Sequence, residues 1–190
     1  VYAFVKNNGG KVAVYKENLY KPMPGYRFIA SNTDRSRYYV GELNGRSSKQ
    51  AYMDALHISE SNIINQTFHN PLGKMNGQDI CIISLKEVSG NGLCCYRQVN
   101  DSDVLVLLEE QDYNEILDET LQRIRRDFKH ISGVFSINCV FRYLLFSQEH
   151  HMEDYLKTMS TLGDHAGLIG FGEHYNQQFV NQTMTCVVFE

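Results

Sequence analysis

Two oppositely charged residues, each close to the end of a predicted strand, could together bind a zwitterionic ligand. Arg142 follows the apolar segment that begins at residue 133, and Glu173 ends the segment "AGLIGFGE". The planar guanidinium of an arginine can hold a carboxylate through two hydrogen bonds, and a glutamate can receive an ammonium group. An amino acid presents both groups. The alternative is that Arg142 and Glu173 pair with each other as a structural salt bridge.

Asn181, Thr183 and Cys139 are the other candidate ligand-binding residues. Asn181 and Thr183 lie two residues apart at the start of the last predicted strand, so their side chains share one face. They could contact the same ligand or cap the preceding turn. As a nucleophile, Cys139 would need a nearby histidine in a partly open, electropositive site. The seven histidines show no recognisable catalytic spacing, which favours a buried structural thiol, and we predict no catalytic residue.

His150, His151 and Glu153 are close enough in sequence to be considered as metal ligands. Adjacent histidines on a helix point about 100° apart, so His150 and His151 cannot both face one ion comfortably. His150 and Glu153 could share an ion, but one pair does not make a site. A solvated helix surface is the favoured interpretation. The sequence also lacks the Gly-rich phosphate loop, HExxH and GxSxG motifs, and it predicts neither a metal nor another cofactor.

The composition argues against several classes of partner. The chain has 190 residues and a net charge of −4, without the clusters of Lys and Arg that nucleic-acid phosphates require. The longest apolar stretch, "VLVLL" at 104–108, is far shorter than the roughly 20 residues of a membrane helix. Five cysteines without a Cys-x-x-Cys pair favour free thiols in a reducing cytosol. We therefore expect a cytoplasmic protein with no nucleic-acid or membrane partner.

Three helices are predicted from apolar spacing. The clearest covers residues 112–129, where Asp112 is placed to cap the helix and Glu115 to complete a capping box. A second covers 148–160 with Ser147 as its cap, and a third includes residues 51–56 with Ser47 or Ser48 as its cap. Residues 59–78 are predicted to be a loop with a possible short helical turn.

The rest of the chain is predicted to be mainly strands. A hairpin is expected over residues 1–16, and a strand over 37–45 that enters a turn at Asn44-Gly45. The further predicted strands are "DICIISLKEV", "GLCCYRQV", "DVLVLLEE", "GVFSINCVF" at 133–141, "AGLIGFGE" and "TMTCVVFE", the last two joined by the polar turn "HYNQQFVNQ". This pattern predicts a mixed β-sheet packed with about three helices, an α/β or α+β fold.

Residues 132–188 resemble the C-terminal domain of the FIST family of sensory modules. Four segments carry the resemblance in the order of the family: "CVFR" (139–142), "MEDYLKTM", "GFGE" ending at 172–173, and "NQTMTCVVF" with Asn181 and Thr183. The strand, turn and helix "YYVGELNGRSSKQAYMDAL" at 38–56 is similar to the start of the family's domain. The family usually has Gly before the Arg, where this chain has Phe141, and the loop after Gly-Glu is short here.

The resemblance implies a FIST C-type sensory domain over residues 25–190, preceded at 1–24 by the tail of an N-terminal FIST domain. It implies signal transduction through a small ligand, amino acids or related metabolites being suggested. The output partner would be a histidine kinase of a two-component system, a chemotaxis transducer or a cyclic-dinucleotide enzyme. The alternatives are a protein interaction module, including a homodimer formed through an exposed strand edge, and an enzyme that uses Cys139.

Overall fold

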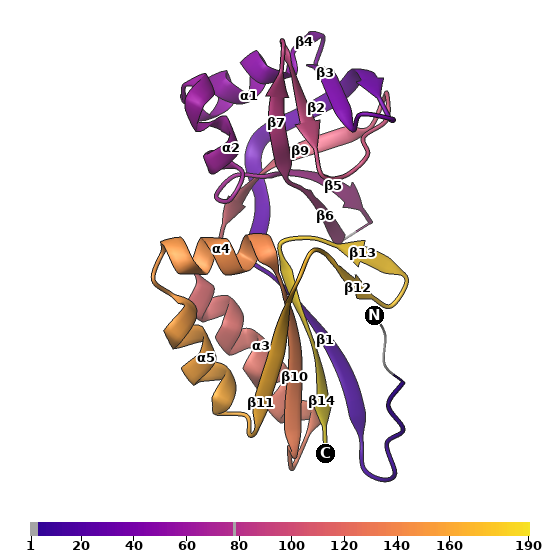
Figure 1. The fold of residues 1–190 in the computed structure, drawn as a ribbon, viewed down its shortest axis with the longest axis vertical. Coiled ribbons are helices and arrows are strands. Elements are labelled where there is room, and N and C mark those ends of the chain that lie inside the picture. The colour runs from indigo at the N-terminus through magenta and orange to yellow at the C-terminus, as the bar shows by residue number, and fades with distance from the viewer. Residues whose placement is uncertain (1–3, 78) are drawn as a thin grey trace. The chain divides into compact units, whose positions relative to one another are not determined.

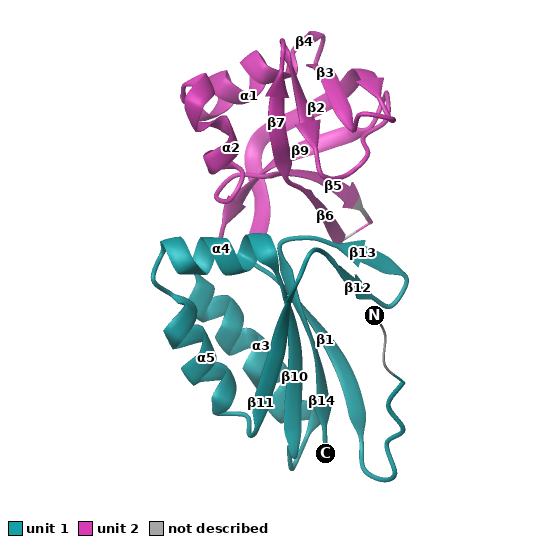
Figure 2. Ribbon diagram, in the orientation of Figure 1, with its two compact units in different colours: residues 1–19, 112–190 teal, residues 20–111 magenta. Residues whose placement is uncertain are grey.

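The structure is a computed structural model that describes residues 4–77 and 79–190, and it divides into two compact units (Figure 2). Unit 2 is continuous and comprises Tyr20–Gln111. Unit 1 is discontinuous, since it combines the residues up to Leu19 with Asp112–Glu190. Each unit has its own sheet, helices and buried core, and each is described separately below.

Unit 2 is built around a sheet of eight strands (Figure 1). The strands are Tyr20–Asp34 (β2), Tyr39–Leu43 (β3), Arg46–Ser47 (β4), Leu72–Asn76 (β5), Asp79–Ile83 (β6), Leu85–Ser89 (β7), Gly92–Cys95 (β8) and Val104–Glu110 (β9). Their order is β6-β5-β9-β2-β3-β8-β7, with β4 paired to β3, and every pair within it is antiparallel.

The long strand β2 bends because its sequence interrupts the ladder. The register with β9 shifts between Pro22 and Arg27, a stretch that contains Pro24 and Gly25. Proline cannot donate to a strand partner, and Gly25 adopts a φ of 86° that favours glycine. After the bend, β2 pairs with β9 again over residues 27–29 and then with β3 from Ala30 onwards. One strand thereby connects the two parts of the sheet.

Three short helices complete unit 2: Ser48–Leu56 (α1), the 3-10 helix Glu60–Asn62 (η1) and Ile63–Gln66 (α2). The hydroxyl of Ser47 accepts a hydrogen bond from the backbone N–H of Gln50 and caps α1, as one of the two predicted candidates. Fully buried apolar side chains such as Tyr52, Leu43 and Leu107 fill the space between these helices and the sheet. This core is almost wholly apolar.

Unit 1 contains a four-stranded mixed sheet in the order β1-β14-β10-β11. The strands are Val12–Asn18 (β1), Gly133–Cys139 (β10), His165–Gly170 (β11) and Thr183–Phe189 (β14). Strand β14 is antiparallel to both neighbours, whereas β10 and β11 are parallel. A small hairpin of Glu173–Tyr175 (β12) and Gln178–Val180 (β13) lies between β11 and β14 in sequence.

Three helices belong to unit 1: Tyr113–Asp127 (α3), Val140–Gln148 (α4) and Met152–Ser160 (α5). Helices α4 and α5 form the crossover that parallel strands require, here from β10 to β11 (Figure 1). In α3, the Asp112 carboxylate accepts hydrogen bonds from the backbone N–H groups of Asn114 and Glu115, and Leu117, Leu121 and Ile124 face the core. The predicted helix and its cap are confirmed.

The α+β class is confirmed, with a mixed sheet and helices in unit 1 and an antiparallel sheet in unit 2. Within the described residues, no helix is long and apolar enough to cross a membrane. The predicted turn at Asn44-Gly45 is also confirmed. Both residues have positive φ angles of 53° and 70°, as a two-residue hairpin turn of type I′ requires.

Two predicted segments have a different structure from the one expected. The expected hairpin over 1–16 is not formed: residues 4–11 have no regular structure, and residues 1–3 lie outside the described part of the chain. Strand β1 pairs instead with β14, with Val12 opposite Phe189. The loop expected over 59–78 contains the predicted helical turn but also β5, which pairs with β6 and β9. The partner of β1 is distant in sequence and leaves no local signal, whereas β6, one partner of β5, follows it directly in sequence.

The predicted strand at 133–141 and helix at 148–160 have different boundaries in the structure. Strand β10 ends at Cys139, and residues 140–148 form α4, so Val140 and Phe141 begin a helix instead of ending the predicted strand. The buried residues Arg142, Leu145 and Phe146 follow helical spacing. Ser147 lies inside α4 and donates to the Tyr143 carbonyl, so it does not cap α5, which begins at Met152.

Two other predicted strands are divided. "DICIISLKEV" splits at Ser84 into β6 and β7, which pair with different neighbours, β5 and β8. "AGLIGFGE" ends at Gly170, so Glu173 begins β12 instead of ending a strand. The polar segment expected to be a simple turn contains the β12–β13 hairpin, with Asn176 at a positive φ of 54° in its turn.

Candidate functional site

A buried ion pair joins the start of α4 to the end of β1. The guanidinium Nη2 of Arg142 donates to Glu17 Oε1, and the side chains are 1 % and 0 % exposed. Burying two charges costs several kcal/mol per ion unless geometry and further hydrogen bonds compensate. In the structure, Arg142 Nε and Nη1 and Glu17 Oε2 have no hydrogen-bond partner. The pair is therefore only partly compensated by protein groups.

Two aromatic rings offset part of the cost of burying the Arg142 charge. The Arg142 guanidinium lies 4.6 Å from the ring centroid of Phe146 and 5.4 Å from that of Tyr155. Both separations fall within the range of a cation–π attraction, which strengthens when the cation is desolvated. Phe146 belongs to α4 and Tyr155 to α5, so the buried cation binds the two helices of the crossover together.

Glu173 occupies a second buried polar cluster, formed where β12 meets β10 and β14. The hydroxyl of Thr183 donates to Glu173 Oε2 over 2.8 Å, and the thiol of Cys139 also hydrogen-bonds this carboxyl group. Burial raises the pKa of Glu173 to about 7, and the hydrogen bonds and the nearby Arg142 charge offset only part of this shift. Near neutral pH, Glu173 is thus divided between its protonated and ionised forms.

All five residues proposed from the sequence are buried in unit 1. The exposed fractions are 2 % for Cys139, 1 % for Arg142, 3 % for both Glu173 and Thr183, and 8 % for Asn181. Glu173 contacts both Cys139 and Thr183. The ion-pair partner of Arg142 is Glu17 and not Glu173, because α4 turns the guanidinium towards β1. The role of these five residues in binding a ligand stays a prediction.

Burial raises the pKa of the Cys139 thiol, and the nearby Glu173 charge raises it further. A nucleophilic cysteine needs the opposite, a depressed pKa and partial exposure. The histidines considered for a metal lie in the turn between α4 and α5 and not on an exposed helix face. His151 packs against Phe146, with ring centroids 4.8 Å apart. Within residues 4–77 and 79–190, no three His, Cys, Asp or Glu residues gather closely enough to hold a metal.

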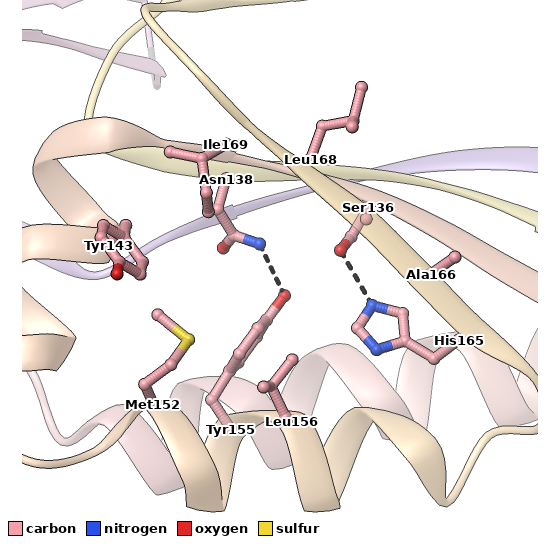
Figure 3. A pocket seen from close by; sticks show the side chains of 11 residues that line it. Ser136, Asn138, Tyr143, Met152, Tyr155, Leu156, His165, Ala166, Leu168 and Ile169 are labelled. Carbon is pink, nitrogen blue, oxygen red and sulfur yellow. Dashed lines mark hydrogen bonds between the residues drawn. The ribbon is translucent and has the colours of Figure 1, made fainter.

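A cavity of about 250 Å³ lies between the crossover helices and strands β10 and β11 at the edge of the sheet (Figure 3). Side chains on alternate positions of β10 point to the same face, which places Ser136 and Asn138 together under α5. The lining residues are Ser136, Asn138, Tyr143, Met152, Tyr155, Leu156, His165, Ala166, Gly167, Leu168 and Ile169.

Two hydrogen bonds organise the polar residues of this cavity, as the dashed lines of Figure 3 show. Asn138 Nδ2 donates to the Tyr155 hydroxyl over 3.0 Å, and Ser136 Oγ lies 2.9 Å from His165 Nε2. Burial raises the pKa of Tyr155 and lowers that of His165, so both side chains are neutral at neutral pH. Asn138 Oδ1 is buried and has no hydrogen-bond partner.

Sequence reasoning missed Ser136, Asn138 and Glu17. A signal existed for the first two, because they are polar residues at alternate positions of an otherwise apolar strand, and such residues need buried partners. No local signal marked Glu17, whose partner Arg142 lies 125 residues away. Tyr155 was recognised only as an apolar helix position, although its hydroxyl contacts Asn138 and its ring contacts Arg142.

The model of the FIST C domain family matches residues 49–176, about two thirds of the chain. The match begins in α1 of unit 2 and ends in the β12–β13 hairpin of unit 1. It therefore includes Arg142, the cavity and Glu173. Comparisons with curated proteins and with solved structures produced no match.

Proposed function

The chain belongs to the FIST C domain family, and on this basis we propose that it binds a small ligand and transmits the binding event to a partner. FIST C is a family of sensory, non-catalytic domains. The proposed ligand site is the cavity between β10, β11 and the crossover helices of unit 1 (Figure 3). The proposed output partner is a histidine kinase, a chemotaxis transducer or a cyclic-dinucleotide enzyme.

The observation that carries this proposal is a cavity with a mainly apolar lining and a few fixed polar groups. Ligand sites typically combine these features, since apolar walls supply affinity and a few polar groups fix orientation. Met152, Leu156 and Ile169 contribute apolar surface, while Asn138 and the Ser136–His165 pair contribute hydrogen-bonding atoms. Asn138 lines the cavity, and its buried amide oxygen has no protein partner.

The same residues provide a way for binding to alter the protein. Tyr155 lines the cavity, accepts a hydrogen bond from Asn138 and packs against the Arg142 guanidinium. A ligand that fixes Tyr155 would therefore favour one arrangement of α4 and α5. The ligand can shift the equilibrium between the two arrangements of these helices only by the difference in its affinity for them. We propose that this shift in the crossover helices is the signal passed to the partner.

A thermal-shift screen tests the proposal. A ligand at 100 times its dissociation constant adds about 2.7 kcal/mol to the free energy of unfolding. For a domain of this size, each kcal/mol raises Tm by about 2–4 °C. We expect one class of metabolite to give a shift of several degrees. A diverse library that leaves Tm unchanged would remove the support for a sensor.

Matched substitutions locate the binding site in the same screen. Leu156→Trp places a large ring in the cavity and should abolish the ligand-induced shift. Ile64→Trp is the control, because Ile64 is also a partly exposed apolar residue on a helix but lies in α2 of unit 2. This variant should keep the full shift. Loss of the shift in both variants, or in neither, would contradict the proposed location.

An amino-acid ligand held by Arg142 and Glu173, with Asn181 and Thr183 nearby, stays a second proposal for the ligand. It requires Arg142 to exchange the Glu17 carboxylate for that of the ligand. Amino acids in the screen test it directly. The homodimer also stays a prediction, and light scattering over a range of protein concentrations would measure the mass of the particle in solution.

A further inference from the structure

The cavity of unit 1 has a lining without formal charge. None of its residues is an Asp, Glu, Lys or Arg. His165, the one residue with a basic ring, has its pKa lowered by burial, and its Nε2 is engaged with the Ser136 hydroxyl. A carboxylate or ammonium group placed at the buried inner end of the cavity, beside Asn138, would lose hydration there without meeting an opposite charge, which is unfavourable. The lining therefore selects against charged ligands.

One polar atom of the lining is unsatisfied. Asn138 is 5 % exposed, and its amide nitrogen is already engaged with Tyr155, whereas Oδ1 has no partner. In Figure 3 the amide oxygen lies on the side of Tyr143 and Met152, away from the Tyr155 hydroxyl. An unpaired carbonyl oxygen in a buried site is unfavourable, and a ligand N–H or O–H would relieve it. The cavity thus presents an acceptor that requires a donor.

The remaining walls set the size and the apolar character of a ligand. The cavity volume of about 250 Å³ corresponds to the space of roughly eight water molecules at about 30 Å³ each. Met152, Leu156 and Ile169 bring flexible and branched apolar side chains to this space. A compact molecule with a short apolar portion would fill it.

From these three observations we infer that the cavity binds a small uncharged ligand whose N–H or O–H donates to Asn138 Oδ1, with its apolar portion against Met152 and Leu156. Primary amides, secondary amides and alcohols have this chemistry, and zwitterionic amino acids do not. This inference rests on the proposed sensory function and narrows its ligand class.

Four probes of similar shape separate the contributions of charge and of the donor. They are 3-methylbutanamide, its carboxylate 3-methylbutanoate, the cation 3-methylbutylamine, and N,N-dimethyl-3-methylbutanamide, which is neutral but has no N–H. Each is titrated into the 190-residue chain carrying ¹³C-methyl methionine. The Met152 methyl signal, assigned with a Met152→Leu variant, reports occupancy of the cavity.

We expect the primary amide to move the Met152 signal with an affinity at least tenfold higher than that of the other three probes. Asn138→Leu, which keeps the volume but removes the acceptor, should weaken amide binding about tenfold. Thr185→Val is the matched control. Thr185 is also buried and polar in the same sheet but does not line the cavity, so amide binding should be unchanged.

Equal or tighter binding of the carboxylate or the amine would overturn the inferred ligand class while leaving a ligand site in the cavity. The dimethyl amide tests the donor on the unsubstituted protein, so the result holds even if Asn138→Leu does not fold. If none of the probes moves the Met152 signal, the inference is wrong. The sensory function would still stand where a library compound gives a thermal shift that Leu156→Trp abolishes.

Discussion

Unit 2 encloses a core of apolar side chains, whereas unit 1 encloses charges and amides as well. The buried polar side chains in the described part of unit 2 are the hydroxyl residues Ser48, Thr67 and Ser84. Ser48 donates to the Val40 carbonyl over 2.6 Å, and Thr67 accepts from the Leu85 N–H over 2.8 Å. Unit 2 therefore has the composition of a stable scaffold.

Unit 1 buries all three of the charged residues that are buried in the described chain, Glu17, Arg142 and Glu173. It also contains the unpaired atoms of Asn138, Arg142 and Glu17. Burying such groups without full compensation costs stability. Titratable groups with strongly shifted pKa values, such as Glu173, are enriched at functional sites. The difference between the two cores is consistent with the proposed division of roles, in which unit 2 supplies stability and unit 1 binds the ligand.

Breaking the buried ion pair should have the largest effect on stability. Arg142→Met leaves the Glu17 carboxylate buried without its partner, and we expect the free energy of unfolding to fall by about 3–5 kcal/mol. Urea denaturation, followed by circular dichroism, measures the change. The double variant Arg142→Met with Glu17→Leu should recover most of the loss. If the single variant costs less than about 1 kcal/mol, the pair is not a structural necessity.

A side-chain truncation in the apolar core of unit 2 can be compared with the loss of the ion pair in unit 1. Leu43 is fully buried, and Leu43→Ala should lower the free energy of unfolding by about 2–5 kcal/mol through lost burial and the cavity left behind. Because Leu43 belongs to the core of unit 2 and all cavity-lining residues belong to unit 1, the ligand-induced thermal shift should persist in this variant. Loss of the shift would show that the separation of roles between the units is incomplete.

Glu173 should make the stability of unit 1 depend on pH. Its pKa rises from 4.5 to about 7 on folding, so the folded state binds more protons than the unfolded state between these values. The stabilisation is fully present below pH 4.5 and is lost as the pH rises through about 7. The difference in stability between wild type and Glu173→Gln, measured against pH, isolates the contribution of Glu173.

The comparison with Glu173→Gln is needed because His151 and His165 give the free energy of unfolding a pH dependence of the opposite sign. Burial lowers the pKa of both below 6.5 in the folded protein, so their contribution is lost as the pH falls. Tm measured at intervals from pH 4.5 to 8 for both proteins gives the difference curve. A difference that is independent of pH would contradict the raised pKa of Glu173.

The helix caps provide the smallest comparison between the units. Asp112→Ala in α3 of unit 1 removes two hydrogen bonds to backbone N–H groups, and Ser47→Ala in α1 of unit 2 removes one. We expect losses of about 1 kcal/mol for each, within the range of about 0.5–2 kcal/mol for helix caps, with Asp112 the larger. Denaturation curves measure both. A larger loss at Ser47 would indicate that its second bond, to the Asn91 carbonyl, matters more than the cap.

Local patterns in the sequence were sufficient for α3, for the turn at Asn44-Gly45 and for the α+β class. The cap and the apolar face of α3 both lie within 15 residues, so local sequence was enough to predict this helix. Arg142 and Glu173 were predicted to bind a ligand from their charges and from the family resemblance, and both are buried in unit 1. Their role in ligand binding stays a prediction.

The partners of those residues could not be predicted, because they depend on contacts between distant segments. Glu17 reaches Arg142 only because β1 joins the sheet beside β14, a pairing that no local pattern indicates. The run around Arg142 is apolar enough to fit a buried strand or a buried helix, and the tertiary fold selects the helix. The cavity itself results from the crossover of α4 and α5 over β10.

The division of unit 1 in the sequence has a consequence for how the protein is made. Unit 2 begins and ends on neighbouring strands, with Tyr20 opposite Glu110, so the ribosome releases a complete folding unit once Gln111 has emerged. Strand β1 is synthesised before unit 2 but must wait for residues 183–189 before it can pair. We therefore expect co-translational folding to assemble unit 2 while β1, with Glu17, still lacks its partner strand β14.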